Sequence, residues 1–432
     1  MEIAPGVHLS WDPAQKFNRC RVSIHFALPA KRETATAHAL LPLVMERGYA
    51  DCPDMTQLTK KLARLYGADL TVDARPMGAN HNLCVSVTGI KDQFALEGEP
   101  LTQEYAELAL GTAFHPYFVG ETFDPEAVKI EKQMLKKALE DEVNEKRLYC
   151  QRQANREFFG DSPAGVRQEG YLEEVEGLTA RQLTDAYYEM LRAASIELIV
   201  LGCGEAQTEA VKNALLEELS QVERAPAALA ENMAMPRREP LYKTETFDTT
   251  QAKLCMLFTT GEANPNPPSV SILRVAMSVL GGSATSRLFR NVREKQSLCY
   301  YCGSAAQRAT GVMMIDSGVE PGKEQQAEAA IIAELEGLKN GPITQEEVDD
   351  CRRGLLSSMD ALGDSLAALE NWYYGQITRG EPLYPPEYGK VLTSAVSLDE
   401  VRQTLQSYSY SVCYAVTAEP GTQGKGGSED VE

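Results

Sequence analysis

The sequence predicts an α+β protein built from two similar domains in tandem, each a mixed β-sheet with helices packed on one face. Three observations carry this prediction. The chain has 432 residues, more than one hydrophobic core usually supports. Its apolar runs show both strand and helix periods. The order of these runs in the first half returns in the second, about 210 residues later. We expect domains at 1–222 and 243–420, an Ala- and Pro-rich linker at 223–242, and a disordered Gly-rich tail at 421–432.

The first domain is predicted from both periods. Residues 19–29 alternate as a strand, with Cys20, Val22, Ile24 and Phe26 on one face. Asp54 is the expected N-cap of a helix that ends before Gly67. The same reasoning gives helices over 34–47, 104–113, 125–159, 178–192 and 205–222, and strands over 68–77, 81–90 and 195–203.

The second domain repeats this order. Strands are expected over 252–260, 311–319 and 409–418, and helices over 270–280, 323–339 and 397–406. A long helical stretch over 345–379 is expected to break near Gly363, and it matches the stretch over 125–159.

Charge and composition exclude several function classes. The net charge is −20, which argues against nucleic acid as a partner and favours basic or neutral substrates. The chain starts without a secretory pattern, and no apolar run approaches the length needed to span a membrane. Ten cysteines without framework spacing indicate buried free thiols in a reducing compartment. We therefore expect a cytoplasmic protein that binds neither membrane nor nucleic acid.

Residues 281–301, GGSATSRLFRNVREKQSLCYY, form the most informative stretch. A Gly pair precedes a helix expected from about 285 to 294, and a strand begins near Leu298. Arg293 and Tyr300 therefore lie seven residues apart, on either side of a tight turn from helix to strand. From the residues alone, Arg293 would cap its own helix and Tyr300 would pack in the core.

Two such domains, with Ser286-Arg287-Leu288-Phe289, then Arg293-Glu294-Lys295, then Leu298 and Tyr300 early in the second, resemble the insulinase or pitrilysin-type zinc metallopeptidases. The resemblance covers nearly the whole chain. It implies two α+β domains that form half of a clamshell around a peptide or unfolded polypeptide. It also implies a zinc site in the first domain, made by His-x-x-Glu-His on the first helix and a distal Glu.

The zinc motif is degenerate in this sequence. Matching the helix end at Gly48 places Ala39, Pro42 and Leu43 on the two His and the Glu. Shifting the register to His38 restores neither the Glu nor the second His. Lysines occupy the region expected for the distal Glu, 136–138, and nearby Glu140 and Glu142 alone do not make a zinc site. The other histidines, His8, His25, His81 and His115, have no metal-ligand spacing, and we interpret each as a surface or satisfied core residue. We expect no metal or other cofactor in this chain.

The Arg and Tyr of the family motif are present. The resemblance implies that Arg293 holds a substrate carbonyl and that Tyr300 donates to the oxyanion formed when water attacks it. Some family members are heterodimers in which one chain has the zinc helix and the other has only the Arg/Tyr pair. We therefore expect a non-catalytic subunit of a peptide-processing heterodimer, active only with a zinc-bearing paralogue. The likeness extends to bacterial members associated by name with modification of elongation factor P.

Two alternatives remain open. One is a structural clamshell that binds a peptide or protein without proteolysis. The other is an enzyme active by itself through unconventional ligands. Cys299 and Cys302 form a C-x-x-C, but we interpret them as structural, because strand residues three apart point to opposite faces.

Overall fold

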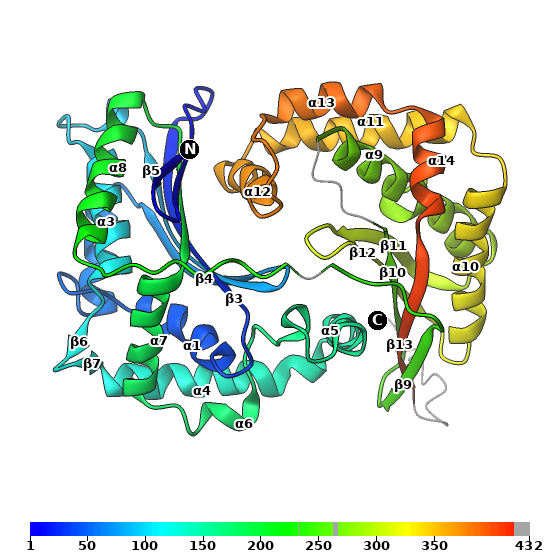
Figure 1. The fold of residues 1–432 in the computed structure, drawn as a ribbon, viewed down its shortest axis with the longest axis horizontal. Helices are drawn as coiled ribbons and strands as arrows, with labels where there is room; N and C mark the ends of the chain where they lie inside the picture. Colours follow the sequence, from blue (N-terminus) through cyan, green and yellow to red (C-terminus); the bar gives the residue numbers. More distant parts are fainter. Residues whose placement is uncertain (232, 262–266, 419–432) are drawn as a thin grey trace, which may run out of the picture. The chain divides into compact units, whose positions relative to one another are not determined.

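The computed structural model describes residues 1–231, 233–261 and 267–418, and it divides the chain into two compact units (Figure 1). Unit 1 comprises Met1–Asp141, Asp161–Asn232 and Asp364–Asn371. Unit 2 comprises Glu142–Gly160, Met233–Gly363 and Trp372–Glu432. The units thus differ from the two contiguous halves expected, because each includes a short segment from the other half. The expected tail, 421–432, lies outside the described residues.

Unit 1 contains a six-stranded sheet in the order β1-β2-β8-β3-β5-β4. Strands β2 and β8 are parallel, and the other neighbours are antiparallel. The strands are β1 (Glu2–Ala4), β2 (Val7–Asp12), β3 (Arg19–Pro29), β4 (Asp69–Met77), β5 (Asn80–Ile90) and β8 (Ser195–Leu201). A small hairpin, β6 (Phe118–Val119) and β7 (Thr122–Phe123), lies apart. The helices are α1 (Ala35–Met45), α2 (Met55–Arg64), α3 (Leu101–Phe114), α4 (Pro125–Asp141), α6 (Leu172–Val175), α7 (Ala180–Ala193) and α8 (Glu205–Ser220).

Unit 2 contains a five-stranded sheet in the order β11-β12-β10-β13-β9. Its strands are β9 (Leu241–Phe247), β10 (Ala252–Thr259), β11 (Cys299–Gln307), β12 (Val312–Val319) and β13 (Ser409–Ala418). Its helices are α5 (Lys146–Phe159), α9 (Pro267–Met277), α10 (Glu324–Asn340), α11 (Gln345–Leu362), α13 (Pro386–Ala395) and α14 (Leu398–Gln406). Helix α12 (Leu366–Ile377) begins in unit 1, and its residues from Trp372 belong to unit 2.

The two sheets confirm the internal repeat. The two sheets have equivalent strand orders: β2-β8-β3-β5-β4 in unit 1 corresponds, strand by strand, to β9-β13-β10-β12-β11 in unit 2. Each sheet has one parallel pair at the same place, β2 with β8 and β9 with β13. In both units, helices cover one sheet face with an apolar core, which includes Val22 and Ile24 in unit 1 and Leu254 and Met256 in unit 2. The predicted α+β class with helices on one face is therefore correct for each unit.

The opposite face of each sheet is covered by the segment that comes from the other half of the sequence. In unit 2, Cys150 and Ala154 of α5 pack against Leu257 and Val412. In unit 1, Glu370 near the start of α12 contacts Arg21 on β3. These two segments explain why the units are not contiguous in sequence.

Three expected elements differ in the structure. The helix expected over 125–159 is divided into α4 and α5, because Leu135 packs in the core of unit 1 while Cys150 packs in unit 2. The end of the expected linker, from Leu241, pairs with β13 as β9. The helix expected over 285–294 is a π-helical segment, Leu288–Lys295. Among the described residues, no helix is both long and apolar enough to cross a bilayer.

Candidate functional site

Helix α1, where the resemblance would place zinc ligands, is apolar and packed in unit 1. Ala39 is 8% exposed, Pro42 is buried, and Leu43 packs half-buried against the core. A Cβ atom on Gly170 would lie 3.4 Å from the Ala39 Cβ, so there is little space at this point of the helix. These three side chains offer no nitrogen, sulfur or oxygen atom to a cation. The positions therefore do not fit zinc.

The region expected for the distal Glu is engaged in surface ion pairs. The Lys136 ammonium lies 2.8 Å from a carboxylate oxygen of Glu176. Glu140 is exposed on α4, and Glu142 pairs with Arg152 at 3.1 Å. Both carboxylates therefore lie just beyond the expected stretch 136–138, and among the described residues neither belongs to a group that could hold a metal ion.

Two of the five histidines depart from the expected satisfied state. His38 and His81 are buried with their ring centroids 5.0 Å apart, and neither Nε2 atom has a hydrogen-bond partner. Burial lowers the pKa of His38 to about 3 and that of His81 to about 4, so both rings are neutral at pH 7. By contrast, the exposed His115 lies 3.0 Å from Glu218, and the His8 side chain is 43% exposed.

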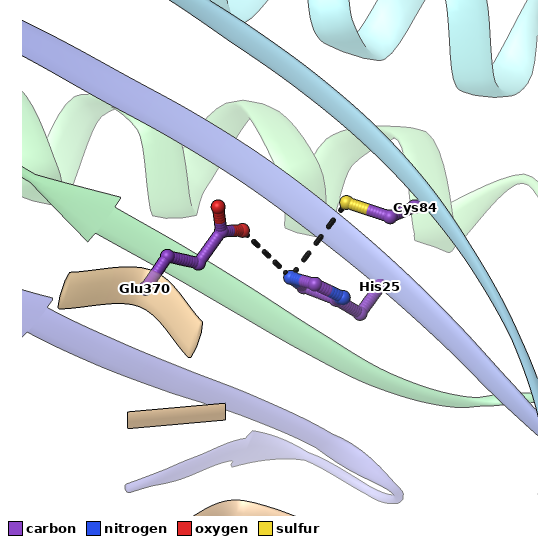
Figure 2. A group of neighbouring side chains, drawn as sticks. All are labelled: His25, Cys84 and Glu370. Atoms are coloured by element: carbon purple, nitrogen blue, oxygen red, sulfur yellow. Dashed lines mark hydrogen bonds and ion pairs between the residues drawn. The ribbon is translucent and has the colours of Figure 1, made fainter. Parts of the chain in front are cut away.

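His25 belongs to a buried polar cluster on the face of the unit 1 sheet opposite the helices (Figure 2). Its Nε2 atom lies 2.9 Å from a Glu370 carboxylate oxygen and 3.7 Å from the Cys84 sulfur. The ligand-type atoms of these three residues lie within 4.8 Å of one another. Figure 2 shows His25 on β3 pointing between Cys84 on β5 and Glu370 on α12. No spacing in the sequence indicated this cluster.

The negative charge of Glu370 in this cluster is neutralised by an ion pair with Arg21. The Arg21 guanidinium pairs with the second oxygen of Glu370, and it also donates to the hydroxyls of Ser86 and Thr88 at 2.8 and 2.7 Å. Burial would raise the pKa of Glu370, but the hydrogen bond with His25 and the charge of Arg21 outweigh it and lower the pKa to about 2. Burial raises the pKa of the Cys84 thiol well above its usual value. A protonated thiol beside a paired carboxylate is a structural arrangement that holds α12 on the sheet.

The turn that carries Arg293 begins with Gly281, at a position that has no space for a larger residue. A Cβ on Gly281 would lie 2.7 Å from Leu288 Cδ1 and 2.8 Å from the backbone nitrogen of Ser304. Two π-helical segments flank this point, Ser278–Gly282 and Leu288–Lys295. π-Helical turns are rare and occur often at functional sites.

A bulge at Tyr300 turns its side chain outward. Cys299 pairs with Val319, and Tyr301 pairs with the adjacent Gly318, so Tyr300 has no partner opposite it. Just before the strand, Ser297 adopts φ +51°, in the left-handed region. The two features together end the π-helical segment and start β11 within a few residues. Bulges commonly re-aim side chains next to functional sites.

Arg293 and Tyr300 line one cleft of about 470 Å³ in unit 2. Tyr300 is 53% exposed, and Arg293 is exposed with its guanidinium 4.5 Å from the Phe289 ring. Neither side chain makes a hydrogen bond or ion pair with any described residue. Glu294 and Glu320 line the same cleft. The interpretation in which Tyr300 packs in the core is therefore wrong, whereas Arg293 does lie in the last turn of its π-helical segment.

The bulge also corrects the interpretation of the C-x-x-C. The inserted residue places Cys299 and Cys302 on the same face, and both are buried in the core of unit 2. A hydrogen bond with Cys302 lowers the pKa of Cys299, with Arg293 nearby contributing in the same direction. All ten cysteines are buried and free, as the sequence predicted.

The duplicated α+β unit has an apolar helix at the positions where the resemblance would place the metal ligands. Residues 177–355 match the family model described as "Peptidase M16 inactive domain". The chain is 25% identical over 362 residues to the "Probable inactive metalloprotease YmfF" of Bacillus subtilis (strain 168), with 84% of each chain covered. It is also 31% identical over 136 residues to the "Uncharacterized zinc protease YmxG" of the same organism, covering 30% of this chain and 33% of that one.

A solved structure agrees with these matches. The crystal structure of a conserved protein from Enterococcus faecalis V583 superposes with a TM-score of 0.85 at 26% identity, covering 96% of this chain and 97% of that one. Residues 177–355 are thus similar to the M16 inactive domain, and the chain is similar over most of its length to a probable inactive metalloprotease.

Proposed function

We propose that this chain is the zinc-less subunit of an M16 peptidase heterodimer. It supplies Arg293 and Tyr300 to a substrate bound at the zinc centre of a partner chain. The observation that carries the proposal is the contrast within the chain: α1 has no ligand atom at Ala39, Pro42 or Leu43, while the cleft in unit 2 presents a free guanidinium and a free phenol.

Exposure and chemistry support this role for the pair. A side chain kept for packing would be buried, yet Tyr300 is 53% exposed on a bulge that turns it out. A guanidinium can donate two hydrogen bonds to a peptide carbonyl, and a phenol can donate one to an oxyanion. Two donors aimed at one cleft match what peptide hydrolysis needs beside a metal-bound water.

The relatives and the charge support a partner and a substrate class. One organism, Bacillus subtilis, has both a relative named as a probable inactive metalloprotease and one named as a zinc protease. We infer a zinc-bearing paralogue of this kind as the partner. Glu294 and Glu320 in the cleft, with a net charge of −20, favour a basic or neutral peptide over an acidic one.

The test is peptidase activity of the chain combined with a zinc-bearing relative. Tyr300→Phe removes one oxyanion donor, and we expect kcat to fall by about 10²–10³-fold with KM little changed. Arg293→Ala removes a charged hydrogen bond, and we expect kcat/KM to fall at least about tenfold. Association of the two chains, measured by size-exclusion chromatography, should stay the same for both variants.

Matched controls come from the same unit. Tyr388→Phe changes a tyrosine that is 48% exposed on α13, and Arg402→Ala changes an arginine on α14 whose side chain is 39% exposed. Neither should alter activity. If Tyr300→Phe and Arg293→Ala behave like these controls while the complex is active, the role in trans is wrong. A complex that forms and binds peptide without cleaving it would favour the binding-protein alternative.

A further inference from the structure

A second charged group in unit 2, away from the Arg293 cleft, has too many positive charges for its surroundings. It consists of Arg274 on α9, Arg308 between β11 and β12, and Arg379, Glu381 and Tyr384 between α12 and α13. We call these five residues the arginine cluster. Three guanidinium groups and one carboxylate leave a formal charge of 3 − 1 = +2. The chain as a whole carries −20, so this local excess is opposite in sign to the rest of the protein.

The cluster is well enclosed. The Glu381 side chain is 0% exposed and that of Arg379 is 11% exposed, and the two form an ion pair. Tyr384 is only 5% exposed. Arg274 and Arg308 are half-buried. Buried charges in proteins are normally paired, because removing an unpaired charge from water is costly.

Each member nevertheless has a polar atom without a partner. The atoms are Arg274 Nη1, Arg308 Nη1, Arg379 Nη2, Glu381 Oε2 and the Tyr384 hydroxyl, and all five are buried without a hydrogen bond to any residue that the structure describes. Four of these five groups are donors. A ligand that satisfied them would therefore be rich in acceptor oxygens and carry negative charge.

The surrounding contacts hold the cluster in place. The Trp372 indole donates to the Tyr384 carbonyl at 2.8 Å, and the Gln376 side chain bonds to both backbone groups of Tyr384. The Arg274 guanidinium stacks 4.5 Å from the Trp372 ring. These contacts fix the backbone around Tyr384 and the position of Arg274, and none of them involves the five unpartnered atoms.

The electrostatics agree with this picture. Burial lowers the pKa of Arg308 to about 9, and the charges of Arg379 and Arg274 contribute in the same direction. Burial also lowers the pKa of Arg274. A guanidinium pKa falls in this way where several cations are held together without enough counter-charge.

We propose that the arginine cluster binds a phosphate-class dianion, either free phosphate or a phosphomonoester. A dianion matches the charge of +2, and its several oxygens match the guanidinium and phenol donors. A monocarboxylate would leave one positive charge uncompensated. This site is independent of the proposed role of Arg293 and Tyr300.

The first experiment measures binding of inorganic phosphate to the full-length chain by isothermal titration calorimetry and by thermal unfolding. Ionic strength is held constant with chloride, and phosphate is kept in the millimolar range, where general salt stabilisation is small. We expect saturable binding and a rise in Tm that acetate does not give. Glycerol phosphate is compared with inorganic phosphate, and the tighter of the two identifies the esterified or the free form as the ligand.

The variant Arg308→Gln separates binding from structure. It should weaken phosphate binding at least about tenfold, because it removes a charged donor. Without phosphate, it should leave Tm unchanged or raised, since it also removes repulsion from Arg274 and Arg379. The control Arg402→Gln, on α14, where the arginine side chain is 39% exposed, should retain the full phosphate response.

Two outcomes would overturn the proposal. One is an equal response of wild type and Arg308→Gln to phosphate. The other is the absence of any phosphate response beyond that of chloride. If Arg308→Gln does not fold, broadening of the ³¹P resonance of phosphate by the wild-type chain decides the matter, and an unbroadened resonance contradicts the site.

Discussion

The two sheets share a strand order and differ in what covers the face away from the helices. In unit 2 that face is mainly apolar, with Leu257 and Val412 under Cys150 and Ala154 of α5, beside one ion pair between Arg147 of α5 and Asp316. In unit 1 it is polar, with Arg21 and His25 under Glu370 of α12. Both covering segments come from the other half of the sequence. In the same topology, the second face of the sheet can thus be covered mainly by hydrophobic packing or mainly around a buried ion pair. The residues of the covering segment determine which of the two occurs.

The difference has an energetic consequence. An apolar contact loses its stabilisation gradually as methyl groups are removed. A buried ion pair loses far more when one partner is removed, because an uncompensated charge remains. The two units should therefore respond differently to substitution at the equivalent faces.

The largest effect is expected for Glu370→Ala. It leaves Arg21 buried without this counter-charge and removes the contact between His25 and the Glu370 carboxylate. We expect the free energy of unfolding to fall by about 3–5 kcal/mol. Urea unfolding measures the loss, and hydrogen exchange should locate it in β3 and β5. The control Glu173→Ala breaks an ion pair with Arg32 in which the glutamate is 69% exposed, and it should cost less than about 1 kcal/mol. Similar costs for both variants would mean that the ion pair is not what stabilises this face.

The next effect is expected for Leu257→Ala in unit 2. Leu257 is 0% exposed beneath α5, so truncation leaves a cavity and should cost about 3 kcal/mol. Hydrogen exchange should rise in β10 and β13 rather than in β3 and β5. Leu148→Ala, on the same covering helix but 48% exposed, is the control and should have little effect. Faster hydrogen exchange in unit 1 of the Leu257→Ala variant would contradict this prediction, since it would show that the covered sheet faces of the two units do not respond independently.

A third effect, which is absent at neutral pH, is the pH dependence of unit 1, which contains all five histidines of the sequence. His38 and His81 have folded pKa values of about 3 and about 4, whereas unfolded histidine titrates near 6.5. The unfolded state therefore takes up protons first as the pH falls. Their contribution to stability is fully present above about pH 6.5 and declines toward pH 4, by up to about 1.4 kcal/mol per pH unit for each ring.

His38→Gln tests this dependence. Glu197 has a pKa raised to about 7 by burial, so its own contribution rises as the pH falls and partly offsets the histidines. The quantity to compare is therefore the difference between wild type and variant, from urea unfolding at pH 6.5 and 4.5. We expect the variant to lose less stability than wild type over this range. Parallel curves would show that His38 does not remain neutral in the folded state.

The sequence predicted much of the fold and one part of the candidate site. The repeat of strand and helix periods predicted two α+β units, because apolar periodicity depends on the chain locally. It also singled out Arg293 and Tyr300 through their spacing. It could not show that both are exposed in one cleft, since the bulge at Tyr300 arises from pairing with β12. The same bulge placed Cys299 and Cys302 on one face, against the alternation expected of a regular strand.

The buried cluster in unit 1 had only a weak sequence signal. His25 and Cys84 are 59 residues apart, and His25 and Glu370 are 345 apart. The polar alternation of Arg21, Ser23 and His25 along β3 could have indicated a polar sheet face, but not its partner. The arginine cluster is similar, because its residues come from α9, a hairpin turn and the loop after α12.

What the sequence by itself determined is therefore local: the periods of the elements, the repeat, the missing ligands at Ala39, Pro42 and Leu43, and the Arg/Tyr spacing. Only the tertiary structure decided which segment covers which sheet, which charges are buried together, and which side chains remain free to bind. The physical reason is that burial and pairing depend on segments far apart in the chain, and a period or a spacing carries no information about them.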